Sequence, residues 1–167
     1  MHPHGSIGPI AYGSSNNSLN ISQAAYDVPM AMLTEPQLQT LHAAMDTLIP
    51  PDENPGAWDN GAGDYLLRQF EGDLAHAVLE YRIGLDALDR EAHTVYGNGF
   101  AQLPLEQRTA LLAAIEDGNE QAPWPVPAAS FLTQLVNHTA EGYYADPAQG
   151  GNPACASWDM IGFHITG

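Results

Sequence analysis

Apolar residues recur at alternating steps of three and four in separate segments of this chain. No segment shows the convincing alternation of two that a half-buried strand requires. The longest helical stripe consists of Leu74, Val78, Tyr81, Leu85, Leu88 and Val95. Residues at this spacing lie on one face of an α-helix. We therefore expect an all-α protein whose helices pack through these faces.

Local signals place about five helices along the chain. They are expected at residues 34–49, 61–70, 73–97, 104–118 and 128–144. Thr34 and Gln37 are spaced as a capping box, with Pro36 in the first turn, where its missing N–H costs nothing. Asp73 is a candidate cap for the third and longest helix. These elements predict one helical domain over residues 33–145.

Irregular segments are expected on both sides of this domain. Residues 1–32 are rich in His, Gly, Ser, Asn and Pro, which predicts an extended N-terminal arm. Residues 146–167 predict an irregular tail, although this tail contains Trp158, Met160, Ile161 and Phe163. Apolar side chains among glycines and prolines indicate a tail that packs on its own domain or on a partner.

The charge of the chain excludes several kinds of partner. Twenty acidic residues face four arginines and no lysine, for a formal net charge of −16. Nucleic acid and anionic membranes both require cations that this chain lacks. No apolar run is long enough to span a bilayer, so no direct membrane insertion is expected.

No enzyme motif is found, and we expect no catalytic, cofactor-binding or metal-binding residues in this chain. The nucleophile elbow and the glycine-rich dinucleotide loop are both absent. His138 and Glu141 share one helix face at i, i+3, and a metal-dependent helical enzyme using these two residues is an alternative. Since no Glu-x-x-His pair occurs, we favour a buried His138 that is hydrogen-bonded within the tail.

Three stretches together resemble a known family. The first contains Leu48-Ile49-Pro50, Pro55-Gly56-Ala57 and Gly63-Asp64-Tyr65. The second contains Tyr81-Arg82, Gly84-Leu85-Asp86-Ala87-Leu88, Phe100 and the segment 105–115. The third and most specific contains His138-Thr139, Glu141-Gly142-Tyr143-Tyr144, Asp146-Pro147, Gly150-Gly151-Asn152, Trp158 and Ile161-Gly162-Phe163. In order and spacing, the chain resembles the gluconate 2-dehydrogenase subunit 3 family.

The resemblance implies a helical, chaperone-like small subunit that performs no chemistry itself. Its partner would be a large flavoprotein of the glucose–methanol–choline (GMC) type, which carries FAD and oxidises a CH–OH group of a sugar. A cytochrome subunit as a further member of the complex is left open. A stand-alone protein-binding adaptor remains an alternative function.

The resemblance also bears on localisation, because many members of the family carry a twin-arginine signal. Residues 1–32 contain no Lys or Arg and therefore no signal of this kind. We expect a cytoplasmic protein from the sequence as written. The alternative is a periplasmic protein whose twin-arginine signal has been removed.

The expected partner interface combines the tail with the loop at residues 50–60. Its candidate residues are Trp58, His138, Glu141, Tyr143, Tyr144, Asp146, Gly150, Gly151, Asn152, Trp158 and Phe163. Trp158 and Phe163 are the proposed apolar anchors, and the alternative is that they close the domain's own core. Gly150, Gly151 and Asn152 are expected to form a tight turn that positions Trp158.

Overall fold

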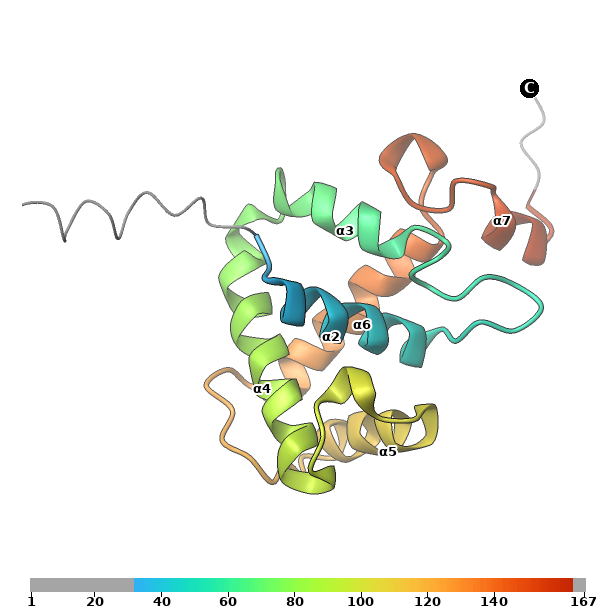
Figure 1. Ribbon diagram of the computed structural model, residues 1–167. Coiled ribbons are helices and arrows are strands. Elements are labelled where there is room, and N and C mark those ends of the chain that lie inside the picture. Colours follow the sequence, from blue (N-terminus) through green and yellow to red (C-terminus); the bar gives the residue numbers. More distant parts are fainter. Residues whose placement is uncertain (1–31, 164–167) are drawn as a thin grey trace, which may run out of the picture. The chain divides into compact units, whose positions relative to one another are not determined.

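The computed structural model describes residues 32–163 (Figure 1). Within this range the chain forms five longer α-helices, a short sixth one and three 3-10 turns, and no β-strand. The α-helices are α2 (Glu35–Leu48), α3 (Ala62–Phe70), α4 (Val78–Tyr96), α5 (Leu105–Glu116), α6 (Ala128–Tyr143) and α7 (Ala156–Met160). The 3-10 turns are η1 (Ala75–Ala77), η2 (Phe100–Gln102) and η3 (Pro147–Gln149). The all-α prediction is confirmed.

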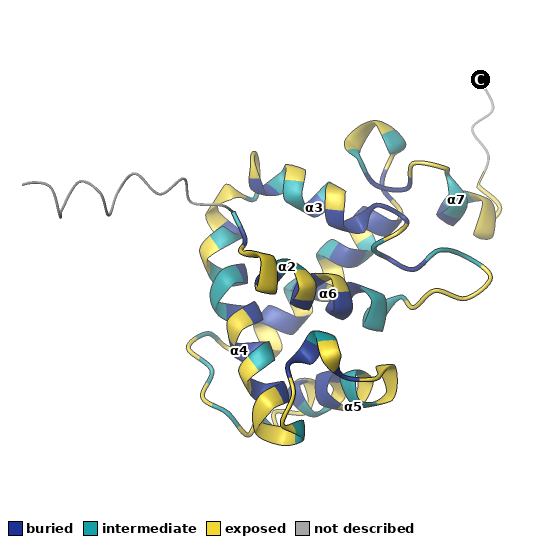
Figure 2. Cartoon of the chain, viewed as in Figure 1, coloured by how far each residue is buried: buried dark blue, intermediate teal, exposed yellow. Residues whose placement is uncertain are grey.

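Helices α2 and α6 each contact all of the other four long helices and hold them around one core. Figure 2 shows the buried faces of these helices turned toward one another. The largest fully buried side chains include Leu41, Met45, Leu66, Tyr81, Leu85, Leu88, Phe100, Ile115, Phe131, Leu135 and Tyr143. In Figure 1, α5 lies at the bottom of the view and α7 at the upper right, so these two helices are well separated. None of the helices in residues 32–163 has the length and hydropathy needed to cross a membrane.

The N-terminus of α2 has the predicted capping box. The Thr34 hydroxyl accepts a hydrogen bond from the Gln37 backbone N–H (3.5 Å), and Gln37 Oε1 accepts one from the Thr34 N–H (2.9 Å). The proposed cap at Asp73 is wrong, because η1 precedes α4 and no side chain caps α4 at Ala77. Asp73 instead lies in the turn in which Leu74 N–H donates to the Gln69 carbonyl (2.8 Å).

The predicted apolar stripe of α4 holds over its middle and fails at its C-terminal end. Tyr81, Leu85 and Leu88 are buried, whereas Val95 is exposed. One turn before Val95, Glu91 takes an inward position and is itself buried. A charged residue at this point of an apolar stripe requires polar partners in the core.

Glu91 obtains these partners from the proline-rich connector between α5 and α6. Its Oε1 accepts the Gln121 N–H (2.6 Å), and its Oε2 accepts the Ala122 N–H (2.8 Å) and the Trp124 indole N–H (3.2 Å). Three donors therefore compensate the burial of one carboxylate. The connector has no helix of its own, so Glu91 fastens it to α4.

We predict that Glu91→Gln lowers the free energy of unfolding by about 2 kcal/mol, because the amide offers one acceptor where the carboxylate offers two. Urea denaturation followed by circular dichroism measures this change. The matched control is Glu106→Gln, which alters an exposed glutamate of α5. Equal stability of the two variants would contradict the role of Glu91.

Candidate partner-binding site

Two neighbouring tyrosines at the end of α6 face different environments. The Tyr143 side chain is buried, and its hydroxyl donates a hydrogen bond to the Pro55 carbonyl (3.2 Å). Tyr144 is 42% exposed, and the two rings meet edge to face with their centroids 5.1 Å apart. Tyr143 therefore packs inside its own domain, whereas the Tyr144 side chain is exposed at the surface.

Residues 150–152 pass close to α6 and to the loop that precedes α3. A Cβ atom on Gly151 would overlap the carbonyl oxygen of Gly142 in α6. The Asn152 N–H donates to the Asn60 carbonyl (2.7 Å), and Asn60 Nδ2 donates to the Tyr143 carbonyl (3.0 Å). Asn60 therefore joins the end of α6 to the beginning of the tail.

The turn itself is formed from local contacts. Asp146 Oδ1 accepts the Ala148 N–H (2.8 Å) and so caps η3. Gly150 follows η3 with φ +100°, a left-handed conformation that glycine adopts without strain. The predicted tight turn at residues 150–152 thus begins with a left-handed glycine that directly follows a capped 3-10 turn.

Polar contacts also fix the position of α7 and of Trp158. Asn152 Oδ1 accepts the Ser157 N–H (3.1 Å) at the start of α7. The Trp158 indole N–H donates to the Tyr144 carbonyl (2.9 Å). The Phe163 ring lies edge to face on Trp158 with a centroid distance of 5.2 Å. The tail, predicted to be irregular, therefore contains a short helix that is bonded back to the end of α6.

Apolar side chains remain exposed on this fastened tail. Tyr144, Met160, Ile161 and Phe163 are between 42% and 60% exposed, and Trp158 is half-buried beside them. We call these five residues the tail apolar face. The sequence analysis did not place Met160 and Ile161 among the interface candidates. Their apolar character within a tail rich in glycine and proline is the signal that identifies them.

Trp58 packs on its own domain. Its backbone N–H donates to Asp46 Oδ1 (2.9 Å), and its ring stacks on His42 with a centroid distance of 4.6 Å. A Cβ atom on Gly63 would come within 2.6 Å of the ring, so the indole lies directly against α3. Trp58 thereby holds the α2–α3 loop in place.

His138 pairs with a residue of α4. Its Nδ1 lies 2.8 Å from the Tyr81 hydroxyl, so the prediction of a hydrogen bond within the tail is wrong. The partner is 57 residues away in sequence, and no local pattern identifies it. Burial lowers the pKa of His138, and the nearby Glu141 opposes that shift. Burial likewise raises the pKa of Tyr81, so its hydroxyl stays protonated and donates to the neutral imidazole.

The metal-enzyme alternative finds no ligand set in residues 32–163. No three His, Cys, Asp or Glu side chains of this range gather where they could hold one ion. Glu141 is exposed on α6, one turn after His138. The two residues share a helix face as predicted, but a metal centre needs further ligands.

These observations define a class of protein: a small all-α domain whose most distinctive surface is an apolar tail held by polar contacts. A family model described as gluconate 2-dehydrogenase subunit 3 matches residues 35–167. The chain belongs to this family, as the three sequence stretches indicated. The family is that of a subunit of a dehydrogenase, an oxidoreductase complex. No curated protein and no solved structure matches the chain.

We predict that Gly151→Ala weakens the attachment of the tail, because its methyl group would overlap the Gly142 carbonyl. Forcing this contact apart should cost about 1–3 kcal/mol. Limited proteolysis measures the effect as faster cleavage after residue 145. The control is Gly72→Ala, whose Cβ would have its nearest neighbours 4.0 Å away. Unchanged cleavage in Gly151→Ala would show that the tail does not depend on this contact.

We also predict a pH dependence from His138. Its folded-state pKa lies below the ordinary value of 6.5, so the unfolded state binds the proton more tightly. The free energy of unfolding should therefore fall as the pH drops below about 6.5, until the folded-state pKa is passed. Urea titrations at several pH values compare the wild type with His138→Gln, whose amide oxygen still accepts from Tyr81. The stability of the wild type relative to this variant should decrease on acidification, and a constant difference would refute the assignment.

Proposed function

We propose that this chain is the non-catalytic small subunit of a heteromeric FAD-dependent sugar or glycoside dehydrogenase. In this proposal the tail apolar face binds the large GMC-type flavoprotein. The exposure of Tyr144, Met160, Ile161 and Phe163 on a backbone held by hydrogen bonds is the observation that carries it. Membership in the gluconate 2-dehydrogenase subunit 3 family supports a dehydrogenase complex as the assembly to which the chain belongs.

The contacts of the tail favour binding over closure of the core. A segment that served only to cover the domain would direct its apolar side chains inward, where burial stabilises by about 25 cal/mol per Å². Tyr143 at the end of α6 points inward in this way, whereas Ile161 and Phe163 in the tail and the adjoining Tyr144 remain largely exposed. Exposed aromatic and aliphatic side chains on a fixed backbone form a binding surface that loses little entropy on association.

The redox chemistry is assigned to the partner. Residues 32–163 contain no strand, and the Rossmann-type site for a dinucleotide requires a β-α-β unit. We therefore place FAD and the oxidation of a CH–OH group in the large subunit. A cytochrome subunit would serve as the electron acceptor in a larger form of this complex.

We predict that the double variant Ile161→Ala/Phe163→Ala binds the flavoprotein at least about tenfold more weakly, because interface anchors of this kind dominate affinity. Both residues are exposed in the subunit, so its own stability should change little. The measurement is the dissociation constant of the complex, with flavin absorbance identifying the partner.

The matched control for this experiment is Leu79→Ala, which removes a highly exposed leucine from α4. This control should assemble like the wild type. Equal affinities of the double variant and the wild type would refute the proposed interface. A wild-type chain that travels with no flavoprotein would refute the proposed function itself.

A further inference from the structure

A second surface feature, separate from the tail apolar face, lies along α2. It is a pocket of about 350 Å³, at the low end of the roughly 300–1,000 Å³ typical of small-molecule sites. Helix α2, the η2 turn and α5 supply its walls. The polar side chains that line it are Gln39, His42, Asp46, Gln102 and Arg108. None of them belongs to the predicted partner interface.

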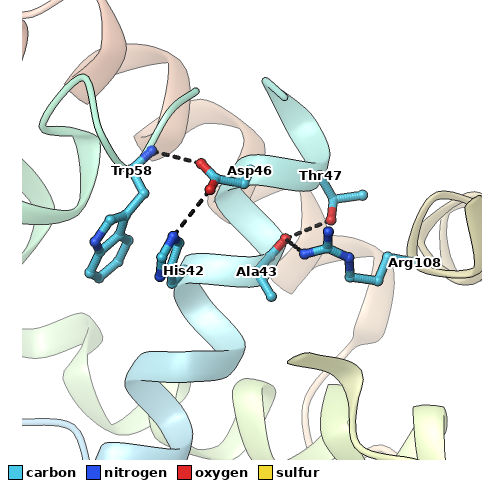
Figure 3. Close-up of polar contacts among 6 residues, drawn as sticks. All are labelled: His42, Ala43, Asp46, Thr47, Trp58 and Arg108. Atoms are coloured by element: carbon cyan, nitrogen blue, oxygen red, sulfur yellow. Dashed lines mark hydrogen bonds and ion pairs between the residues drawn. The ribbon is translucent and has the colours of Figure 1, made fainter. Parts of the chain in front are cut away.

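Arg108 has no carboxylate partner in residues 32–163. Its Nη1 donates to the Ala43 carbonyl (3.0 Å), which also accepts from the Thr47 hydroxyl (2.6 Å), as Figure 3 shows. The two close histidine–aspartate pairs of this range involve other residues, and Arg108 Nε is buried without a hydrogen-bond partner. The positive charge of Arg108 is therefore not balanced by a carboxylate within the described residues, although the chain contains 20 acidic residues.

His42 is fixed in position and keeps one ring nitrogen free. Its Nε2–H donates to Asp46 Oδ2 (3.1 Å), since a carboxylate can only accept, and its ring stacks on Trp58. Figure 3 shows Asp46 between the His42 ring and the Trp58 backbone N–H. In the tautomer with its single proton on Nε2, the imidazole has a lone pair on Nδ1 that can accept a hydrogen bond. The hydrogen bond to Asp46 and the stacking on Trp58 together fix the orientation of the His42 ring, as a binding site requires.

From this arrangement we infer that the pocket binds a carboxylate group, with Arg108 as counter-ion and His42 Nδ1 as acceptor for a hydroxyl of the same ligand. The amides of Gln39 and Gln102 supply further donors and acceptors. Asp46 limits the negative charge that a ligand of this pocket can carry, because its own negative charge repels dianions. Its two oxygens already accept hydrogen bonds from Trp58 and His42. The site therefore favours a monocarboxylate with hydroxyl groups over phosphate.

Two sources can supply this carboxylate. A free hydroxy acid of sugar size provides both the anion and the hydroxyl. An acidic side chain of the partner subunit provides the anion alone, and this second source rests on the proposed function. The two are distinguished by testing the isolated full chain and the complex separately.

In the first arm, the full chain is titrated with sodium D-gluconate and with D-glucitol, its uncharged counterpart, and amide NMR shifts are followed. Saturable shifts near Ala43 and Gln102 with gluconate, absent with glucitol, are expected. Arg108→Gln should raise the dissociation constant about tenfold or more, because a charge-assisted hydrogen bond is lost. The control is Arg90→Gln, which removes a guanidinium bonded to the Pro123 carbonyl and should leave binding unchanged.

In the second arm, the same two variants are assembled with the flavoprotein. If gluconate does not bind, a loss of assembly in Arg108→Gln that is absent in Arg90→Gln assigns the carboxylate to the partner. The inference is overturned if gluconate does not bind and both variants assemble like the wild type. Failure of the wild type itself to assemble would count against the proposed function, and the gluconate titration would still decide the pocket.

Discussion

Three backbone segments meet where α3, α6 and the tail come together, and small residues allow this approach. A Cβ atom on Gly142 would lie 2.8 Å from the Cα of Ala62 in α3. One on Gly151 would overlap the carbonyl oxygen of that same Gly142. Helix α3 packs most extensively against α6, and the tail approaches α6 at this same Gly142. The position of the tail thus depends on Gly142 and Gly151. A side chain at either position would meet backbone atoms, which cannot move aside as the end of a flexible side chain can.

The consequence is a tail whose path is held by hydrogen bonds while several of its apolar side chains remain exposed. Asn152 and the Trp158 indole both donate hydrogen bonds to carbonyl groups of the domain. Ile161 and Phe163 nevertheless remain in water, at a cost that association with another protein would remove. The buried Glu91 shows the same principle at the other end of the domain, where a polar anchor fixes a proline-rich connector.

The features that were predicted correctly from the sequence are those formed by residues close together in the chain. The capping box at Thr34 was predicted, because it involves residues within a few positions of each other. The cap at Asp73 failed because a turn competed with the helix for the same residues. The His138–Tyr81 and Asn60–Tyr143 contacts join positions 57 and 83 residues apart, and only the packing of the helices creates them. The composition of the tail was enough to predict that it packs on its own domain or on a partner. Which of its side chains are buried and which are exposed could be learned only from the structure.

The central claim is that the exposed apolar residues of the tail bind the flavoprotein. Amide hydrogen exchange of the full chain, alone and in the complex, tests it most directly. We expect the largest slowing of exchange in residues 156–163 and at Tyr144, with little change in α4 around Leu79. Slowed exchange confined to other helices, with the tail unchanged, would contradict the claim.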